Sequence, residues 1–408
     1  MFYGWWIVLS VFMAQLFMVG FFSYGYPMLA VEVEAEFQSG MQALSWAMIG
    51  PTILGLGLPL IVGPLVDRWS ARGLMLIGIT ALTFGFLTLA WAPSVLAFVL
   101  GMSILVGGAN TFLGPIVGSA VVSRWFTASR GRALGFAAIG TSIGGILMPP
   151  LLGYGFESIG WRNSLRVMAL AVVVCVLPLL VFVFRDHPRD LGLQAEGAPA
   201  GSDAAAVGPA LASSSAEILR QPAFWAVSVC LAVFLGCYSG TLSNVAKFAS
   251  DLGADGASRA GLMSVLAFSG LIGKLVFGYL ADRIPLKMGL WTAIGLTTAS
   301  VGLMTLEPEF PLLLVAAAVL GLAAGGILPV WGALMAAIFG VANVGRSMGL
   351  QAPIISIGVM PAYWFAGRSH GATGSFVLAF QIFAGALCLA ALILFALRMP
   401  QRPGREAA

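Results

Sequence analysis

Long runs of apolar residues recur from one end of the chain to the other, and they limit what it can fold into. We count twelve runs long enough for a helix to cross the hydrocarbon core of a bilayer, which takes about 18 to 20 residues. Of the 408 residues, 60% are hydrophobic and 9% are charged, so the chain cannot hide its apolar surface in one water-soluble core. The sequence therefore predicts an all-α membrane protein with twelve transmembrane helices.

The predicted spans form two groups of six, separated by a segment of different composition. Residues 185–222 are rich in Ala, Gly, Ser and Pro with scattered charges, which is typical of a flexible linker. We expect an N-terminal six-helix bundle over 1–184, this cytoplasmic linker, a C-terminal six-helix bundle over 223–398 and a cytoplasmic tail over 399–408. The spans are expected near 4–29, 44–64, 73–92, 95–122, 131–155, 162–184, 223–247, 259–281, 286–306, 310–338, 346–366 and 372–397.

The basic residues predict the orientation, since Lys and Arg gather on the cytoplasmic side of membrane proteins. With both termini in the cytoplasm, fourteen Lys and Arg residues fall inside and five fall outside. The outer loops are expected to carry acids instead, among them Glu32, Glu34 and Glu36. This distribution favours a multi-pass protein of the cytoplasmic (inner) cell membrane, with the lipid bilayer as its partner.

Several other classes of function find no support in the sequence. The net charge of +4 follows from this membrane topology and does not indicate nucleic-acid binding. We find no phosphate-binding loop, nucleophile elbow or zinc signature, and neither His187 nor His370 has metal-ligand spacing. We therefore expect no enzymatic activity, no cofactor and no metal.

The two halves share short motifs at nearly constant spacing. GPLVDR at 63–68 matches GYLADR at 278–283, and RALG at 132–135 matches RSMG at 346–349. Repeated halves joined by a long inner loop suit a transporter in which two bundles rock around a site near mid-membrane. The repeat therefore favours transport of a small solute.

The same motifs resemble those of a known family. GPLVDRWSARG and GYLADRIPLKM are similar to the cytoplasmic loop motif G-x-L-A-D-R-x-G-R-K of the major facilitator superfamily, although Ser70 and Ala71 depart from it. More narrowly, five short segments resemble the branch of monocarboxylate transporters and oxalate/formate antiporters. They are YGWW at 3–6, RWF at 124–126, PP at 149–150, GWR at 160–162 and QPAFW at 221–225. The resemblance implies the major facilitator fold of two pseudo-symmetric bundles, and uptake or exchange of small organic anions by alternating access.

Lys274 is the principal candidate for binding the substrate. It stands in the middle of the predicted span 259–281, and a cation embedded in hydrocarbon costs several kcal/mol, so such residues usually mark a ligand or ion path. The equivalent position in the first half is Pro59, so this charge does not belong to the shared scaffold. The alternative is a lysine that snorkels to the inner surface or holds a structural ion pair. Against snorkelling, its side chain leans towards the outer end of its helix.

The surroundings of Lys274 bear on both interpretations. Ala267, Gly270 and Gly278 form a stripe of small residues on its side of the helix, which leaves room either for a cavity or for close packing of another helix. In the resembled branch, the residue after the equivalent of Gly273 is an arginine that binds the substrate carboxylate. Lysine here supplies a point charge rather than a two-pronged donor.

Other candidates complete the site or gate it. Polar or aromatic residues inside predicted spans could line the site, although each could instead satisfy a neighbouring backbone group. They are Tyr24, Tyr26, Asn110, Tyr238, Asn244, Trp331 and Gln351. Charged residues of the repeated motifs are expected to latch the cytoplasmic side by pairing and by capping helix ends. They are Asp67, Arg68, Asp282, Arg283, Arg132 and Arg346.

The combined interpretation is a monomeric secondary active transporter of a small carboxylate. Dicarboxylate exchangers of the resembled branch carry a second cation in the eleventh span, whereas 346–366 holds only Arg346 at its inner end, which favours monocarboxylates. No acidic residue falls in mid-span, so we expect a proton to travel on the pair of Lys274 and substrate. Two alternatives stay open: an efflux carrier for amphipathic compounds in the same superfamily, and a transporter-like nutrient sensor that does not translocate. An embedded enzyme is the least supported.

Overall fold

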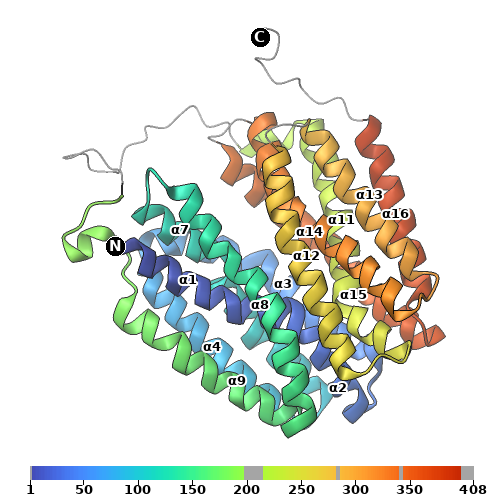
Figure 1. Ribbon diagram of the computed structural model, residues 1–408. Coiled ribbons are helices and arrows are strands. Elements are labelled where there is room, and N and C mark those ends of the chain that lie inside the picture. Colours follow the sequence, from blue (N-terminus) through green and yellow to red (C-terminus); the bar gives the residue numbers. More distant parts are fainter. Residues whose placement is uncertain (1, 197–214, 282–284, 340–342, 397–408) are drawn as a thin grey trace. The chain divides into compact units, whose positions relative to one another are not determined.

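The computed structural model describes residues 2–196, 215–281, 285–339 and 343–396, and it is almost entirely helical (Figure 1). Within these ranges the β-structure consists of one isolated bridge between Phe126 and Glu196. The chain divides into two compact units, one of residues 1–206 with 242–267 and the other of residues 207–241 with 268–408. The prediction of an all-α fold is confirmed.

The N-terminal part forms six helical segments of membrane length. Three of them contain a π-helical stretch, and in the first and fourth segments a further helix follows that stretch. In chain order they are α1 (Gly4–Val19) with η1 (Gly20–Gly25) and α2 (Tyr26–Phe37); α3 (Gly40–Arg68); α4 (Ala71–Ala90); α5 (Val95–Gly101) with η2 (Met102–Val106), α6 (Gly107–Leu113) and α7 (Pro115–Trp125); α8 (Arg130–Ile159); and α9 (Trp161–Cys175) with η3 (Leu179–Val183).

The C-terminal part forms six long helices, preceded by two short ones, η4 (Pro188–Leu191) and α10 (Ser215–Leu219). The long helices are α11 (Pro222–Asp251), α12 (Gly256–Ala281), α13 (Leu286–Met304), α14 (Phe310–Phe339), α15 (Val344–Thr373) and α16 (Val377–Ala396). By length and composition, ten segments among the described residues qualify as membrane spans. The two remaining helices, α13 and α15, have 19 and 30 residues and occupy the predicted ninth and eleventh positions.

The first span is longer than the sequence predicts. We expected it to end near residue 29 and the following acids to lie in a loop, but α2 continues to Phe37. The helix ends only at Gln38, whose φ of 50° is left-handed. Glu32 and Glu34 therefore lie on a helix, whose regular spacing fixes where their side chains point.

The sequence repeat reappears as a repeat of packing. In the first unit α4 packs against α6 and α9, and in the second unit α13 packs against α14 and α16. Because α4 is the third span and α13 is the ninth, each third span holds the same neighbours in its own half. Figure 1 shows the neighbouring pairs α4 and α9, and α13 and α16.

Glycines allow the closest helix crossings. Gly140 and Gly144 lie four residues apart on α8, and a Cβ atom on Gly144 would collide with the carbonyl oxygen of Leu16 in α1. In the second unit, a Cβ atom on Gly236 of α11 would lie 2.7 Å from the carbonyl oxygen of Gly358 in α15. Small residues at this spacing let two membrane helices pack backbone against backbone.

The first residues of the predicted linker are ordered against the first unit. The indole nitrogen of Trp125 donates to the carbonyl oxygen of Arg185 at 3.1 Å, and the backbone nitrogen of Arg72 donates to the Asp186 carboxylate at 2.7 Å. The Glu196 carboxylate accepts from the backbone nitrogen of Ser129 at 3.3 Å and also from its hydroxyl. This segment thus lies along the turn that precedes α8.

Candidate functional site

Lys274 lies on α12 where α14 crosses it closely. A Cβ atom on Gly325 of α14 would lie 2.9 Å from the backbone nitrogen of Lys274, and one on Gly270 would lie 3.4 Å from the carbonyl oxygen of Gly321. The sequence leaves two roles open for the small residues around Lys274, a cavity or close packing of another helix. Gly270 serves close packing against α14. The side chain of Lys274 is half-buried.

The depth of Lys274 distinguishes it from the other described cations. It lies seven residues from Ala281, the nearer described end of α12. Among the residues that the structure describes, every other helical Lys or Arg lies within five residues of a helix end. A charge near a helix end reaches the interfacial region easily, whereas a charge at this depth needs a partner or a polar path.

Two candidates of the first unit lie beside irregular helical turns. Tyr24 belongs to the π-helical η1, and its ring packs on α8 at Gly145, where an added Cβ atom would lie 2.8 Å from Tyr24 Cδ2. Asn110 is half-buried in α6, which follows the π-helical η2 and breaks at the extended Gly114. Wide turns of this kind occur often at functional sites, because they interrupt the regular helical register.

Two further candidates of the first unit have partners within the chain. The hydroxyl of Tyr26 donates to the carbonyl oxygen of Leu44 at 2.7 Å, and the side chain is 2% exposed. The amide nitrogen of Asn244 donates to the hydroxyl of Ser243 at 3.0 Å. Each of these contacts pairs one donor of a buried side chain within the protein, and the role of both residues in substrate binding stays a prediction.

In the second unit a chain of hydrogen bonds joins three helices. Trp331 Nε1 of α14 donates to Gln351 Oε1 of α15 at 2.6 Å, and Gln351 Nε2 donates to Ser228 Oγ of α11 at 3.0 Å. Ser228 in turn donates to the carbonyl oxygen of Phe224 at 2.6 Å. The structure thus brings the predicted site residues Trp331 and Gln351 together, and their side chains form a hydrogen bond with each other.

Aromatic residues of α11 and α15 form further contacts within the same unit. The ring of Tyr238 stacks on that of Phe234 with centroids 6.5 Å apart. Its neighbour Ser239 forms a hydrogen bond with Tyr363 of α15. Tyr363 is not among the residues expected from the sequence, although it is a tyrosine inside a span, the same signal that identified Tyr238.

The expected gating residues are described only in part. Arg132 and Arg346 lie in the first turns of α8 and α15, and Arg132 is exposed. The side chains of Asp67 and Arg68, and the whole of Asp282 and Arg283, lie outside the described residues. The inner latch therefore stays a prediction.

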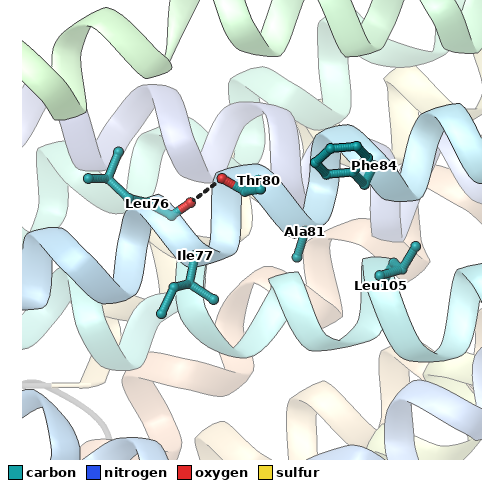
Figure 2. Close-up of a pocket in the computed structure, with 6 residues that line it drawn as sticks. All are labelled: Leu76, Ile77, Thr80, Ala81, Phe84 and Leu105. Carbon is teal, nitrogen blue, oxygen red and sulfur yellow. Dashed lines mark hydrogen bonds between the residues drawn. The ribbon is translucent and has the colours of Figure 1, made fainter.

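A pocket of about 510 Å³ lies on α4 and η2 in the first unit, and none of these candidates lines it. Figure 2 shows its lining residues, which are Leu76, Ile77, Thr80, Ala81, Phe84 and Leu105. The only hydroxyl among them, that of Thr80, donates to the carbonyl oxygen of Leu76 at 2.8 Å (Figure 2). An apolar hollow on a membrane span suits hydrocarbon and offers nothing that would bind an anion. Within the described ranges, no three His, Cys, Asp or Glu side chains are grouped as metal ligands.

Comparisons with known proteins agree with this architecture. The family model described as Major Facilitator Superfamily matches residues 11–308 and 249–408. Monocarboxylate transporter 13 of Rattus norvegicus is 28% identical over 95% of this chain and 87% of its own, and monocarboxylate transporter 11 of Homo sapiens is 29% identical over 81% and 69%. A fujikurins efflux protein of Gibberella fujikuroi is 26% identical over 82% and 68%. Among solved structures, a bacterial homologue of the human lysosomal transporter Spinster has a TM-score of 0.67 at 18% identity, covering 96% of this chain and 95% of that one.

Proposed function

This chain belongs to the major facilitator superfamily of membrane transporters, and we propose that it moves small organic anions, monocarboxylates foremost, by alternating access. The observation that carries the proposal is the depth of Lys274, a cation seven residues inside α12. The charged form of Lys274 attracts a carboxylate at that depth, because the attraction between opposite charges strengthens as water is excluded. The similarity to two monocarboxylate transporters supports the same class of substrate.

The valence of the substrate follows from the count of deep cations. Within the described residues of α15, Arg346 and Arg368 lie near opposite ends, so that helix supplies no second cation at mid-span. One ammonium neutralises one carboxylate, and a second carboxylate would remain desolvated without a partner. A monocarboxylate is therefore the better fit.

The proposed driving ion is the proton. No Asp or Glu lies in the middle of a described span, so a cage of carboxylates for sodium is missing from those residues. When the empty carrier holds Lys274 as a neutral amine, a substrate that arrives with its proton transfers that proton to Lys274 Nζ. This forms a lysinium–carboxylate pair, and the loaded carrier would cross with little net charge. We further propose the cytoplasmic membrane as its location, with both termini inside and a monomer as the working unit.

An efflux carrier for amphipathic compounds is the second candidate. The similarity to a fujikurins efflux protein favours it, because that relative covers 82% of this chain. Such a carrier would bind large apolar ligands whether or not residue 274 is charged. The charge at Lys274 therefore separates the two functions experimentally.

A ligand-stabilisation screen of the purified protein tests the proposal. Short monocarboxylates, dicarboxylates and amphipathic amines would be added to the wild type, Lys274→Gln and the control Lys287→Gln, whose lysine lies at the first turn of α13. A ligand at about 100 times its Kd stabilises a protein by about 2.7 kcal/mol, which is a shift of several degrees in Tm. We expect monocarboxylates to raise the Tm of the wild type and of Lys287→Gln but not of Lys274→Gln. Stabilisation by amphipathic amines alone would establish the second candidate, and tighter binding of a dianion would contradict the proposed valence.

A further inference from the structure

The outer ends of α11 and α12 carry two cations that pair with acids of α2. Lys247 Nζ lies 3.1 Å from Glu34 Oε2, and Arg259 Nη2 lies 3.3 Å from Glu32 Oε1. All four residues lie in the first compact unit, which contains residues 242–267 together with 1–206. These contacts are therefore internal to one compact body.

Both ion pairs are partly shielded from water. The side chains of Lys247 and Arg259 are 15% and 12% exposed, and those of Glu34 and Glu32 are 22% and 31% exposed. Lys247 also lies 3.2 Å from Asp251, one helical turn further along α11. Fully exposed pairs contribute little to stability, but pairs shielded to this degree are screened less by salt and water.

Close packing accompanies the charges. The hydroxyl of Ser264 in α12 donates to the carbonyl oxygen of Ile146 in α8 at 2.9 Å. Further out, a Cβ atom on Gly153 of α8 would lie 3.3 Å from the Cβ atom of Ala260. The outer end of α12 is thus held against α8 by packing and against α2 by charge.

The position of these contacts in the sequence repeat gives them a role. Residues 242–267 belong by sequence to the second six-helix half, whereas α2 and α8 belong to the first. In alternating access, the two halves part on the outer side whenever the carrier opens outwards. We propose that Glu32, Glu34, Lys247 and Arg259 form an outer latch, which holds the outer side closed and breaks in every transport cycle.

A neighbouring ion pair provides a matched control. Glu36 Oε1 lies 2.7 Å from Arg162 Nη2, which joins α2 to α9. Both helices belong to the first half, so this pair stays intact when the halves part. Glu34→Gln and Glu36→Gln thus change the same residue type two positions apart on one helix, and only the first breaks the latch.

The experiment measures how readily the outer side opens. Ser264→Cys serves as the reporter, in a background where the exposed Cys175 and Cys388 are replaced by serine. Intact cells are treated with a membrane-impermeant maleimide, and the labelling rate of residue 264 is followed. We expect Glu32→Gln combined with Glu34→Gln to raise that rate about three- to tenfold, since each broken pair shifts the closed–open equilibrium by up to a few fold. Glu36→Gln should leave the rate unchanged.

The cations provide an independent route to the same result. Lys247→Gln combined with Arg259→Gln should raise the labelling rate as much as the acidic pair does, and adding Lys247→Gln to Glu34→Gln should have little further effect, because both act through one pair. Equal labelling rates in the Glu34 and Glu36 variants would overturn the latch, and so would fully additive effects of Glu34→Gln and Lys247→Gln. No substrate enters the assay, so its outcome does not depend on whether the carrier moves monocarboxylates.

Discussion

His187 lies just after the sixth span, half-buried among charged neighbours. Burial lowers the pKa of its imidazole, the guanidinium groups of Arg124 and Arg189 lower it further, and Asp190 and Asp186 partly oppose the shift. The folded protein therefore takes up this proton less readily than the unfolded chain, whose histidine has a pKa of about 6.5. The neutral form is the one that fits the docked start of the linker.

This shift predicts an acid sensitivity specific to His187. The contribution of neutral His187 to the free energy of unfolding is fully present above about pH 6.5. It falls as the pH drops towards the lowered pKa, because the unfolded state then binds the extra proton. The Tm of the purified wild type should fall more between pH 7.5 and 5.5 than that of His187→Gln. Identical pH dependence in the wild type and His187→Gln would show that this residue has no such effect.

Single residues differ in how far the sequence predicts their surroundings. A charge inside an apolar run is visible in the sequence, so Lys274 stands out as a candidate by its position in the chain alone. The hydrogen-bonded chain from Trp331 through Gln351 to Ser228 could not be predicted from the sequence, because its members come from three helices whose facing sides depend on packing. The same holds for the bond between Tyr26 and Leu44.

At the scale of helices, the crossing of α1 and α8 depends on glycines. Gly144→Ala should lower the Tm, because the added Cβ atom meets the backbone of α1 at Leu16. Gly135→Ala, in the same helix but with nothing within 4 Å of an added Cβ atom, should be neutral or stabilising, since alanine favours a helix by about 1 kcal/mol over glycine. Thermal unfolding of the two variants in detergent measures the difference. An equal Tm in both would mean that the crossing adapts to the extra methyl group.

Helix ends and irregular turns are the least predictable elements. Glutamates at 32, 34 and 36 look like the start of a polar loop in a hydropathy profile, yet they are good helix formers and α2 runs through them. Nothing in the composition of residues 20–25 or 102–106 distinguishes a π-helical turn from an α-helical one. Twelve helical segments in the expected order could be predicted, because each depends only on a long apolar run.

For the whole molecule, the repeated motifs predict two similar halves, and the packing of α4 and α13 repeats accordingly. The docking of Glu196 beside Ser129 could not be predicted, because the composition of the linker carries no signal for one ordered contact. Nor could the ion pairs of Lys247 and Arg259, since their partners on α2 are more than 200 residues away in sequence. Long-range pairing of charges is a property of the folded chain.

The central claim, that Lys274 carries a carboxylate together with a proton, is tested most directly by uptake into proteoliposomes. Wild type, Lys274→Gln and the control Lys287→Gln would be reconstituted at equal density, and uptake of radiolabelled lactate followed under an imposed inward proton or sodium gradient. We predict accumulation driven by the proton gradient alone in the wild type and in Lys287→Gln. The rate in Lys274→Gln should be at least about tenfold lower, since the carboxylate loses the one deep counter-charge found among the described residues. Normal uptake by Lys274→Gln, or accumulation driven by sodium alone, would contradict the account.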